Sequence, residues 1–195
     1  MPVANLTEFF RDNLHGALER QHLAVETGTE HYVVNLLTLF ARSDALYEHS
    51  AEGPRLKPLA AMLADALEAH SASERRRALQ RLGDVSLFIA GFFAGSFARK
   101  LIDIDYHIAM GGRAYQSLAD VLGRSHAFTQ VFAELAEKFQ PLVDTLNDVS
   151  ESSREHTDED VLRLYEIWLK TGSRRSYRLL RELGVNPTPS ARTPQ

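Results

Sequence analysis

Residues 85–98, with the sequence VSLFIAGFFAGSFA, form the most apolar window of this chain. No charged residue interrupts these positions. A helix needs about 20 apolar residues to span a bilayer, so the window is too short for a membrane span. It predicts instead a buried helix at the centre of a helical domain.

Outside this window, apolar residues recur with helical spacing along nearly the whole chain, and no stretch sustains the alternation that is typical of a β-strand. The predicted fold is all-α: a single-domain bundle of about seven to eight helices, with a central apolar helix near residues 74–98. We expect the bundle domain to cover residues 1–184. Residues 185–195 contain three prolines and no core residue, which predicts a disordered tail.

The composition is that of a globular protein, with 44% hydrophobic and 25% charged residues. The formal net charge of −4 gives no general attraction to nucleic acid or acidic lipid. Because the chain has no cysteine, disulfides, thiolate metal sites and cysteine nucleophiles are excluded. Residues 1–20 interleave charged and apolar side chains, unlike a signal peptide, so we expect a cytoplasmic protein of bacterial type.

Local signals mark where helices begin, bend and end. Ser71 followed by Glu74 is a capping box, which predicts the start of a long helix. Residues 50–58 hold one glycine and two prolines and predict a loop. Pro141 interrupts a segment of continuous helical periodicity and predicts a kink there rather than an end.

The segment of residues 82–115, LGDVSLFIAGFFAGSFARKLIDIDYHIAMGGRAY, stands out from the rest. Gly91 and Gly95 lie one turn apart, and glycine is about 1 kcal/mol less favourable than alanine inside a helix, so they predict close packing against another backbone. One hypothesis is a ligand pocket at this corner, with Asp84 as a partly buried acid and His107 as a titratable base. The candidate ligand-binding residues are Asp84, Asp103, Tyr106, His107, Arg113 and Tyr115.

A purely structural interpretation of the same residues stays open. Asp84 would pair with Arg81 on its own helix. Asp103 or Asp105 would be the N-cap of the following helix. The double glycine at residues 111–112 fits this interpretation least well, because alanine usually suffices at a close helix contact.

Signatures of catalysis and of bound cofactors are missing. Glu19 and His22 form one Glu-x-x-His unit, whereas a di-iron bundle needs two such units and two further glutamates. The sequence has no His-Glu-x-x-His motif, no phosphate-binding glycine loop and no Gly-x-Ser-x-Gly elbow. We therefore predict no metal, no cofactor and no catalytic residue, and favour a protein that is not an enzyme.

A basic segment at residues 174–181 follows an acidic one near the C-terminus. The candidate anion-binding residues are Arg174, Arg175 and Arg178. If a helix starts at Ser173, its dipole opposes cations in the first turn, which hints at an anionic partner. Alternatively, the arginines lie on a solvated helix face or pair with the acidic stretch. A patch this small on an acidic protein makes nucleic acid an unfavourable partner.

Two stretches of this chain resemble a group of uncharacterised bacterial all-helical proteins of about this length. In that group, a "GD-x-SLF…GFF" helix is followed by a "DY-x-I-x-MG" helix. The residues that match are Gly83, Asp84, Ser86, Leu87, Phe88, Gly91, Phe92, Phe93, Asp105, Tyr106, Ile108, Met110 and Gly111, with residues 164–180 as a further similar stretch. The resemblance implies an all-helical fold and brings no activity, so it assigns no catalytic residue.

Three functions remain open at this point. The first choice is a non-enzymatic regulatory or binding protein that acts through protein partners, with self-association as a homodimer. The second is a small-molecule-binding protein or enzyme that uses a pocket around Asp84, His107 and Tyr115. The third is binding of phosphate or nucleic acid through the segment Arg174–Arg181.

Overall fold

The computed structural model describes residues 3–41, 46–50, 53–92, 104–123, 126–152 and 180–181. Its internal contacts divide the chain into two units, Met1–Ser153 and Arg154–Gln195. The architecture below is that of the first unit. The predicted domain end at residue 184 and the predicted tail of residues 185–195 lie outside the described residues.

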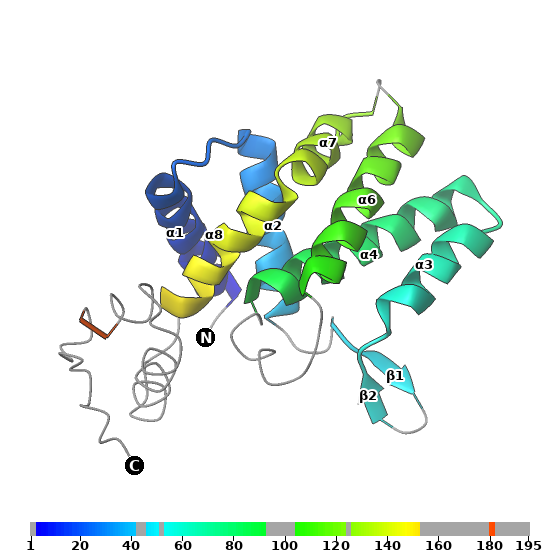
Figure 1. Cartoon of the computed structure of the whole chain (residues 1–195), viewed down its shortest axis with the longest axis horizontal. Helices are drawn as coiled ribbons and strands as arrows, with labels where there is room; N and C mark the ends of the chain where they lie inside the picture. The colour runs from blue at the N-terminus through cyan, green and yellow to red at the C-terminus, as the bar shows by residue number, and fades with distance from the viewer. Residues whose placement is uncertain are drawn as a thin grey trace, which may run out of the picture. The chain divides into compact units, whose positions relative to one another are not determined.

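The described part of the first unit is built from seven α-helices, which confirms the all-α prediction (Figure 1). They are α1 (Val3–Gln21), α2 (Thr27–Phe40), α3 (Leu59–Glu68), α4 (Ala72–Phe92), α6 (Ile104–Leu122), α7 (Thr129–Glu137) and α8 (Phe139–Ser152).

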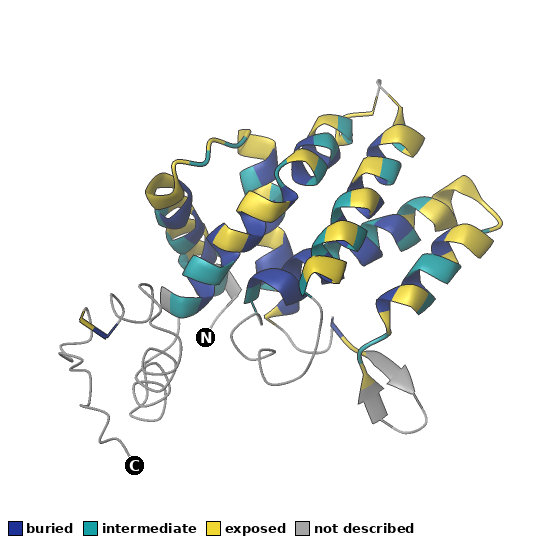
Figure 2. Cartoon of the chain, viewed as in Figure 1, coloured by how far each residue is buried: buried dark blue, intermediate teal, exposed yellow. Residues whose placement is uncertain are grey.

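The apolar helix α4 lies at the centre of this unit and packs against α3, α6 and α8. Every residue from Val85 to Gly91 is buried and Ser86 alone among them is polar, so this half of the helix is enclosed on all sides (Figure 2). A helix that is hydrophobic all round is stable only when other elements enclose it. The predicted central position is thus confirmed for the residues up to Phe92, and residues 93–98 lie outside the described part of the chain.

The start of α4 follows the predicted capping pattern with one change of partner. The Ser71 hydroxyl accepts a hydrogen bond of 3.2 Å from the backbone N–H of Glu74. The Glu74 carboxylate accepts one of 3.0 Å from the backbone N–H of His70, one residue before the capping serine. Two backbone donors near the helix start are satisfied in this way.

At the predicted kink, the helix is interrupted at a single residue in the turn before Pro141, with backbone hydrogen bonds from Lys138 to Glu134 and from Leu142 to Lys138 on either side. α7 ends at Glu137 and α8 begins at Phe139, with Lys138 between them. Pro141 then lies in the first turn of α8, where its missing N–H is not needed.

The prediction of a loop at residues 50–58 was incomplete. The backbone of Glu48–Ser50 (β1) pairs antiparallel with that of Gly53–Arg55 (β2), so the loop connects two three-residue strands. This hairpin is too short to show strand periodicity in the sequence.

The glycines of the central helices are sites of close approach. A Cβ on Gly91 would lie 2.5 Å from the Cβ of Leu146 in α8. A Cβ on Gly111 would overlap the ring of Phe139 in α8 and approach the Cβ of Ser86 in α4 to 2.7 Å. Gly91 therefore packs against a side chain of α8, and its predicted companion Gly95 lies outside the described residues.

The two glycines of the pair 111–112 are expected to respond oppositely to alanine. We expect Gly111→Ala to lower the free energy of unfolding by about 1–2 kcal/mol, because overlap with the Phe139 ring exceeds the gain in helix propensity. Gly112→Ala is the control, since its Cβ would lie 3.7 Å from the nearest atom, an ordinary contact. It should raise stability by about 0.5–1 kcal/mol. Urea unfolding of both variants tests this, and equal effects would contradict the packing.

Candidate ligand-binding site

A pocket of about 580 Å³ opens between helices α2, α4 and α6 and the segment that leads into α7. Its walls are mainly apolar, with a few polar and charged side chains from α2 and α4, which is the usual make-up of a small-molecule site. The lining residues are Tyr32, Asn35, Leu36, Leu39, Ser73, Arg76, Arg77, Gln80, Asp84, Leu118, Leu122, His126, Phe128 and Phe132.

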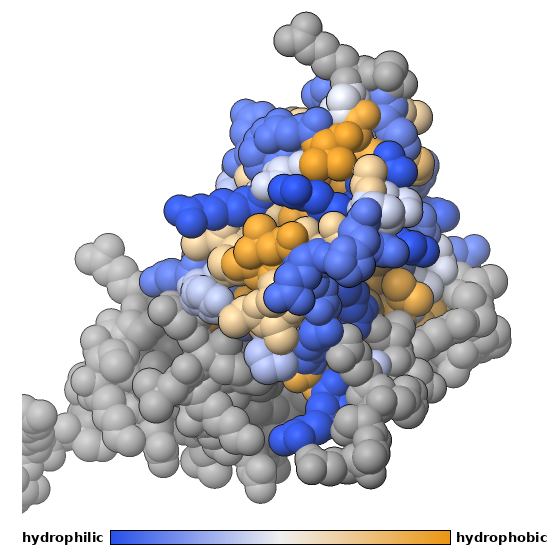
Figure 3. Space-filling model, turned by 90° about the vertical axis from the view of Figure 1, so that its right-hand side faces the viewer, coloured by the Kyte–Doolittle hydropathy of each residue, from blue (hydrophilic) through white to orange (hydrophobic). Residues whose placement is uncertain are grey.

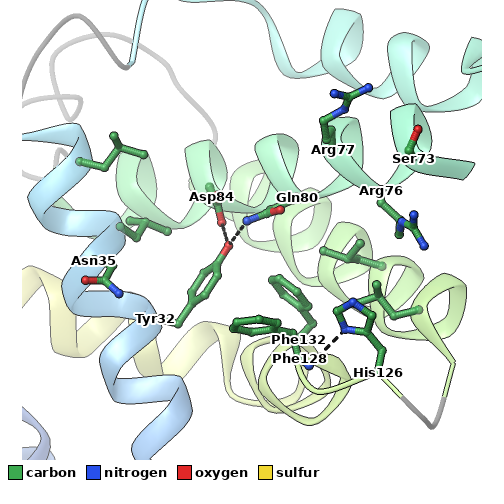
Figure 4. Close-up of a pocket in the computed structure, with 14 residues that line it drawn as sticks. Tyr32, Asn35, Ser73, Arg76, Arg77, Gln80, Asp84, His126, Phe128 and Phe132 are labelled. Atoms are coloured by element: carbon green, nitrogen blue, oxygen red, sulfur yellow. Dashed lines mark hydrogen bonds between the residues drawn. The ribbon is translucent and has the colours of Figure 1, made fainter.

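Asp84 of α4 is the carboxylate of this pocket, and two tyrosines hold it in place. Figure 4 shows the first of them, Tyr32, together with Gln80. The Tyr32 hydroxyl donates to Asp84 Oδ1 over 2.6 Å, and the Tyr115 hydroxyl donates to the same oxygen over 2.7 Å. Gln80 Nε2 donates in turn to the Tyr32 oxygen over 2.9 Å. Neither tyrosine bond uses Asp84 Oδ2, so the second carboxylate oxygen keeps its capacity to accept.

Aromatic packing fixes the positions of the two tyrosine hydroxyls. The Tyr115 ring stacks on Phe132 with centroids 5.7 Å apart, and Tyr32 meets Phe132 edge-on at 5.2 Å. Gly83 makes room for Tyr115, because a Cβ at Gly83 would lie 2.5 Å from that ring. The hydroxyls are thus preorganised by a rigid cluster of rings.

Burial is the main influence on the titration of the Asp84 cluster. It raises the pKa of Asp84 to about 6, although the hydrogen bonds from the two tyrosines and the charge of Arg81 lower it. Burial, followed by the charge of Asp84, raises the pKa of Tyr32 and of Tyr115, so both remain donors at neutral pH. A carboxylate with a perturbed pKa in a pocket is a common mark of a functional site.

Apolar side chains of the pocket reach the surface. Leu39 is 54% exposed and Phe128 is 51% exposed, and both line the pocket. Figure 3 shows, on one face of the molecule, hydrophobic residues that come to the surface in patches between hydrophilic ones. Leu67 of α3 is also exposed, at 68%, but does not line the pocket.

The structure brings together two of the sequence-predicted ligand residues, Asp84 and Tyr115, which share a hydrogen bond. Asp84 lines the pocket, whereas Tyr115 is fully buried and does not line it. His107 is buried and lies eight residues before Tyr115, about 12 Å along the axis of α6, and it does not line the pocket. Tyr106 and Arg113 are exposed and do not line it either.

The other sequence-predicted residues cannot be placed. Asp103 lies outside the described residues, and so do the candidate anion-binding residues Arg174, Arg175 and Arg178. Of the basic segment, only Leu180 and Arg181 are described.

Three further residues, Tyr32, Gln80 and Arg76, line the pocket and are not among the residues predicted from the sequence. The sequence contains a signal for Arg76 and Gln80, because residues 76, 80 and 84 are spaced four apart and so share one face of a helix. Tyr32 gave no signal, since it lies 52 residues before Asp84 and on another helix.

A second buried carboxylate, Glu134 of α7, lies elsewhere and is fully engaged. It accepts bonds of 3.2 and 3.1 Å from the backbone N–H of Glu26 and one from the Thr29 hydroxyl. Lys138 Nζ lies 2.7 Å from it. Glu134 thereby caps the start of α2, which has no side-chain cap of its own.

Among the described residues, no group of three or more His, Asp or Glu side chains is arranged to hold a metal ion. None of the helices in the described part of the chain is long and apolar enough to cross a bilayer. Comparison with protein-family models, with curated proteins and with solved structures finds no significant match to this chain.

Proposed function

We propose that this protein binds a small molecule in the pocket between α2, α4, α6 and α7. The observation that carries this proposal is the position of Asp84, a partly buried carboxylate held by two tyrosines in an apolar cavity of about 580 Å³. Cavities of roughly 300–1,000 Å³ with apolar walls and a few convergent polar groups are typical of ligand sites.

A structural role alone does not require a carboxylate at this position. The two tyrosine hydroxyls need one acceptor, and an asparagine carbonyl oxygen would satisfy both. An ionised Asp84 instead makes folding less favourable, because burial raises its pKa. Residues that lower stability in this way are commonly retained for function.

Because of this pocket, we favour small-molecule binding over action through protein partners, the function that the sequence alone favours. Action through a protein partner and self-association remain predictions. We assign the pocket a binding role and no catalytic step.

The proposal predicts that an apolar dye binds in the pocket and that a charge on its wall expels it. We expect the neutral dye N-phenylnaphthylamine to bind the wild-type protein with a saturable rise in fluorescence. Leu39→Glu should weaken this binding roughly tenfold or more, because the dye would lose an apolar contact and meet a charge.

The matched control is Leu67→Glu, which places the same charge at another exposed leucine outside the pocket. It should bind the dye as the wild type does. Absence of saturable binding to the wild type, or equal loss in both variants, would refute the proposed site.

A further inference from the structure

Four polar side chains follow one another along the pocket face of α4. Ser73, Arg76, Gln80 and Asp84 are three or four residues apart, so they lie on one side of the helix, and all four line the pocket. From Arg76 to Asp84 the helix rises about 12 Å. The pocket therefore has a cationic end and an anionic end at a fixed separation.

The cationic end is available to a ligand. Arg76 is partly buried and Arg77 is exposed, and neither has an ion-pair partner among the residues that the structure describes. Figure 4 shows that the two side chains leave α4 in different directions, with Arg76 on the side of His126. A partly buried guanidinium without a partner favours an anion that can accept its planar set of donors.

The anionic end can also accept a further hydrogen bond. Asp84 Oδ1 accepts from both tyrosines, and Oδ2 accepts no hydrogen bond from the described residues. Since Tyr32 and Tyr115 donate to Asp84, what the ligand must present there is a donor of its own.

The α6 and α7 side of the pocket presents an apolar wall to α4. Leu118 and Leu122 of α6 and Phe132 of α7 form this wall. A ligand that reaches from Arg76 to Asp84 would lie against these side chains and remove their surface from water.

We infer that the ligand is an elongated amphipathic anion. Its carboxylate or phosphate binds Arg76, with Arg77 adding positive charge, and its apolar body lies on Leu118, Leu122 and Phe132. A hydroxyl or amine at its far end donates to Asp84. This inference rests on the proposed function, since it specifies the ligand of the same pocket.

Displacement of N-phenylnaphthylamine by three twelve-carbon competitors tests the inference. The competitors are ω-hydroxydodecanoate, dodecanoate and dodecanol, the two anions below their critical micelle concentrations and the alcohol below its solubility limit. We expect affinity to fall in that order, because dodecanoate lacks the donor for Asp84 and dodecanol lacks the anion. Dodecyl phosphate in place of dodecanoate tells which anionic group the arginine prefers.

Two variants test which residues cause this order of affinities. Arg76→Gln should weaken dodecanoate about tenfold and leave dodecanol unchanged, because only the anion uses the guanidinium. Asp84→Asn should reduce the preference for ω-hydroxydodecanoate over dodecanoate. Arg75→Gln is the control, since Arg75 is an exposed neighbour on α4 that does not line the pocket.

The outcomes separate the inference from the proposed function. If the dye binds but dodecanoate and dodecanol compete equally, or if Arg75→Gln acts like Arg76→Gln, the ligand class is wrong and the pocket stands. If the dye does not bind the wild-type protein in a saturable way, the proposed function itself fails.

Discussion

Asp84→Asn is expected to stabilise this protein above neutral pH. Burial raises the pKa of Asp84 from 3.8 to about 6. For an acid with a raised pKa, the folded state holds its proton more tightly than the unfolded state. The resulting stability is complete below the unfolded pKa and is lost as pH rises through the folded pKa.

The expected size of this effect follows from the shift. One pKa unit corresponds to about 1.4 kcal/mol, and Asp84 is partly open to solvent, so we expect a gain of about 2 kcal/mol near pH 8. Asparagine keeps a carbonyl oxygen for Tyr32 and Tyr115 and removes the buried charge. Near pH 4 most of the gain should disappear, because Asp84 is then protonated in the folded state.

Urea unfolding of both proteins at the two pH values measures the difference. Asp120→Asn, at an exposed position of α6, is the control and should leave stability nearly unchanged at both. A loss of stability in Asp84→Asn that is the same at each pH would mean that the carboxylate is needed for the fold. That result would remove the main argument for a functional acid.

Glu134→Ala is expected to produce the largest loss of stability among the variants considered. Glu134 is 6% exposed and accepts hydrogen bonds from the Glu26 backbone, Thr29 and Lys138. Its removal leaves the first turn of α2 without its cap and a lysine without its ion-pair partner. We expect the free energy of unfolding to fall by about 3 kcal/mol at neutral pH, the lower end for a broken buried pair, because Lys138 is partly exposed.

The pH dependence of this effect has the opposite sign to that of Asp84. Burial raises the pKa of Glu134, but the bonds from Lys138, Thr29 and the Glu26 backbone together lower it below 4.5. An acid with a lowered pKa gives stability above the unfolded pKa, and the stability is lost as pH falls through the folded pKa. The difference between wild type and Glu134→Ala should therefore shrink in acid.

Glu137→Ala provides the matched control, because Glu137 is an exposed glutamate on the same helix. Its effect at neutral pH should stay within about 0.5 kcal/mol. Urea unfolding at pH 7 compares the three proteins. Similar losses for Glu134→Ala and Glu137→Ala would show that the interactions of Glu134 add little to the stability of α2.

The sequence alone was sufficient to predict the helices of the described unit and the burial of the central helix. Helical periodicity, the capping box at Ser71 and the uncharged run from Val85 are local features, and a helix is defined by local hydrogen bonds. The break at Lys138 was less predictable. Pro141 forbids one backbone bond, and the surrounding packing decides whether the helix bends or stops there.

The candidate site was predictable only in part. Asp84 and Tyr115 could be singled out because they lie in an unusual segment, but their contact depends on how α4 packs against α6. His107 came from the same segment, yet the axial rise of α6 puts it about two turns away from Tyr115.

The tertiary structure alone decided which residues complete the pocket. Tyr32 reaches Asp84 across 52 positions of sequence, and Glu134 reaches Thr29 across 105. Such contacts follow from which helix faces meet, and no spacing within one helix encodes them. The sequence therefore determined the helices and their apolar faces. The packing of those faces determined where the Asp84 carboxylate, the Tyr32 hydroxyl and the Arg76 guanidinium line one cavity.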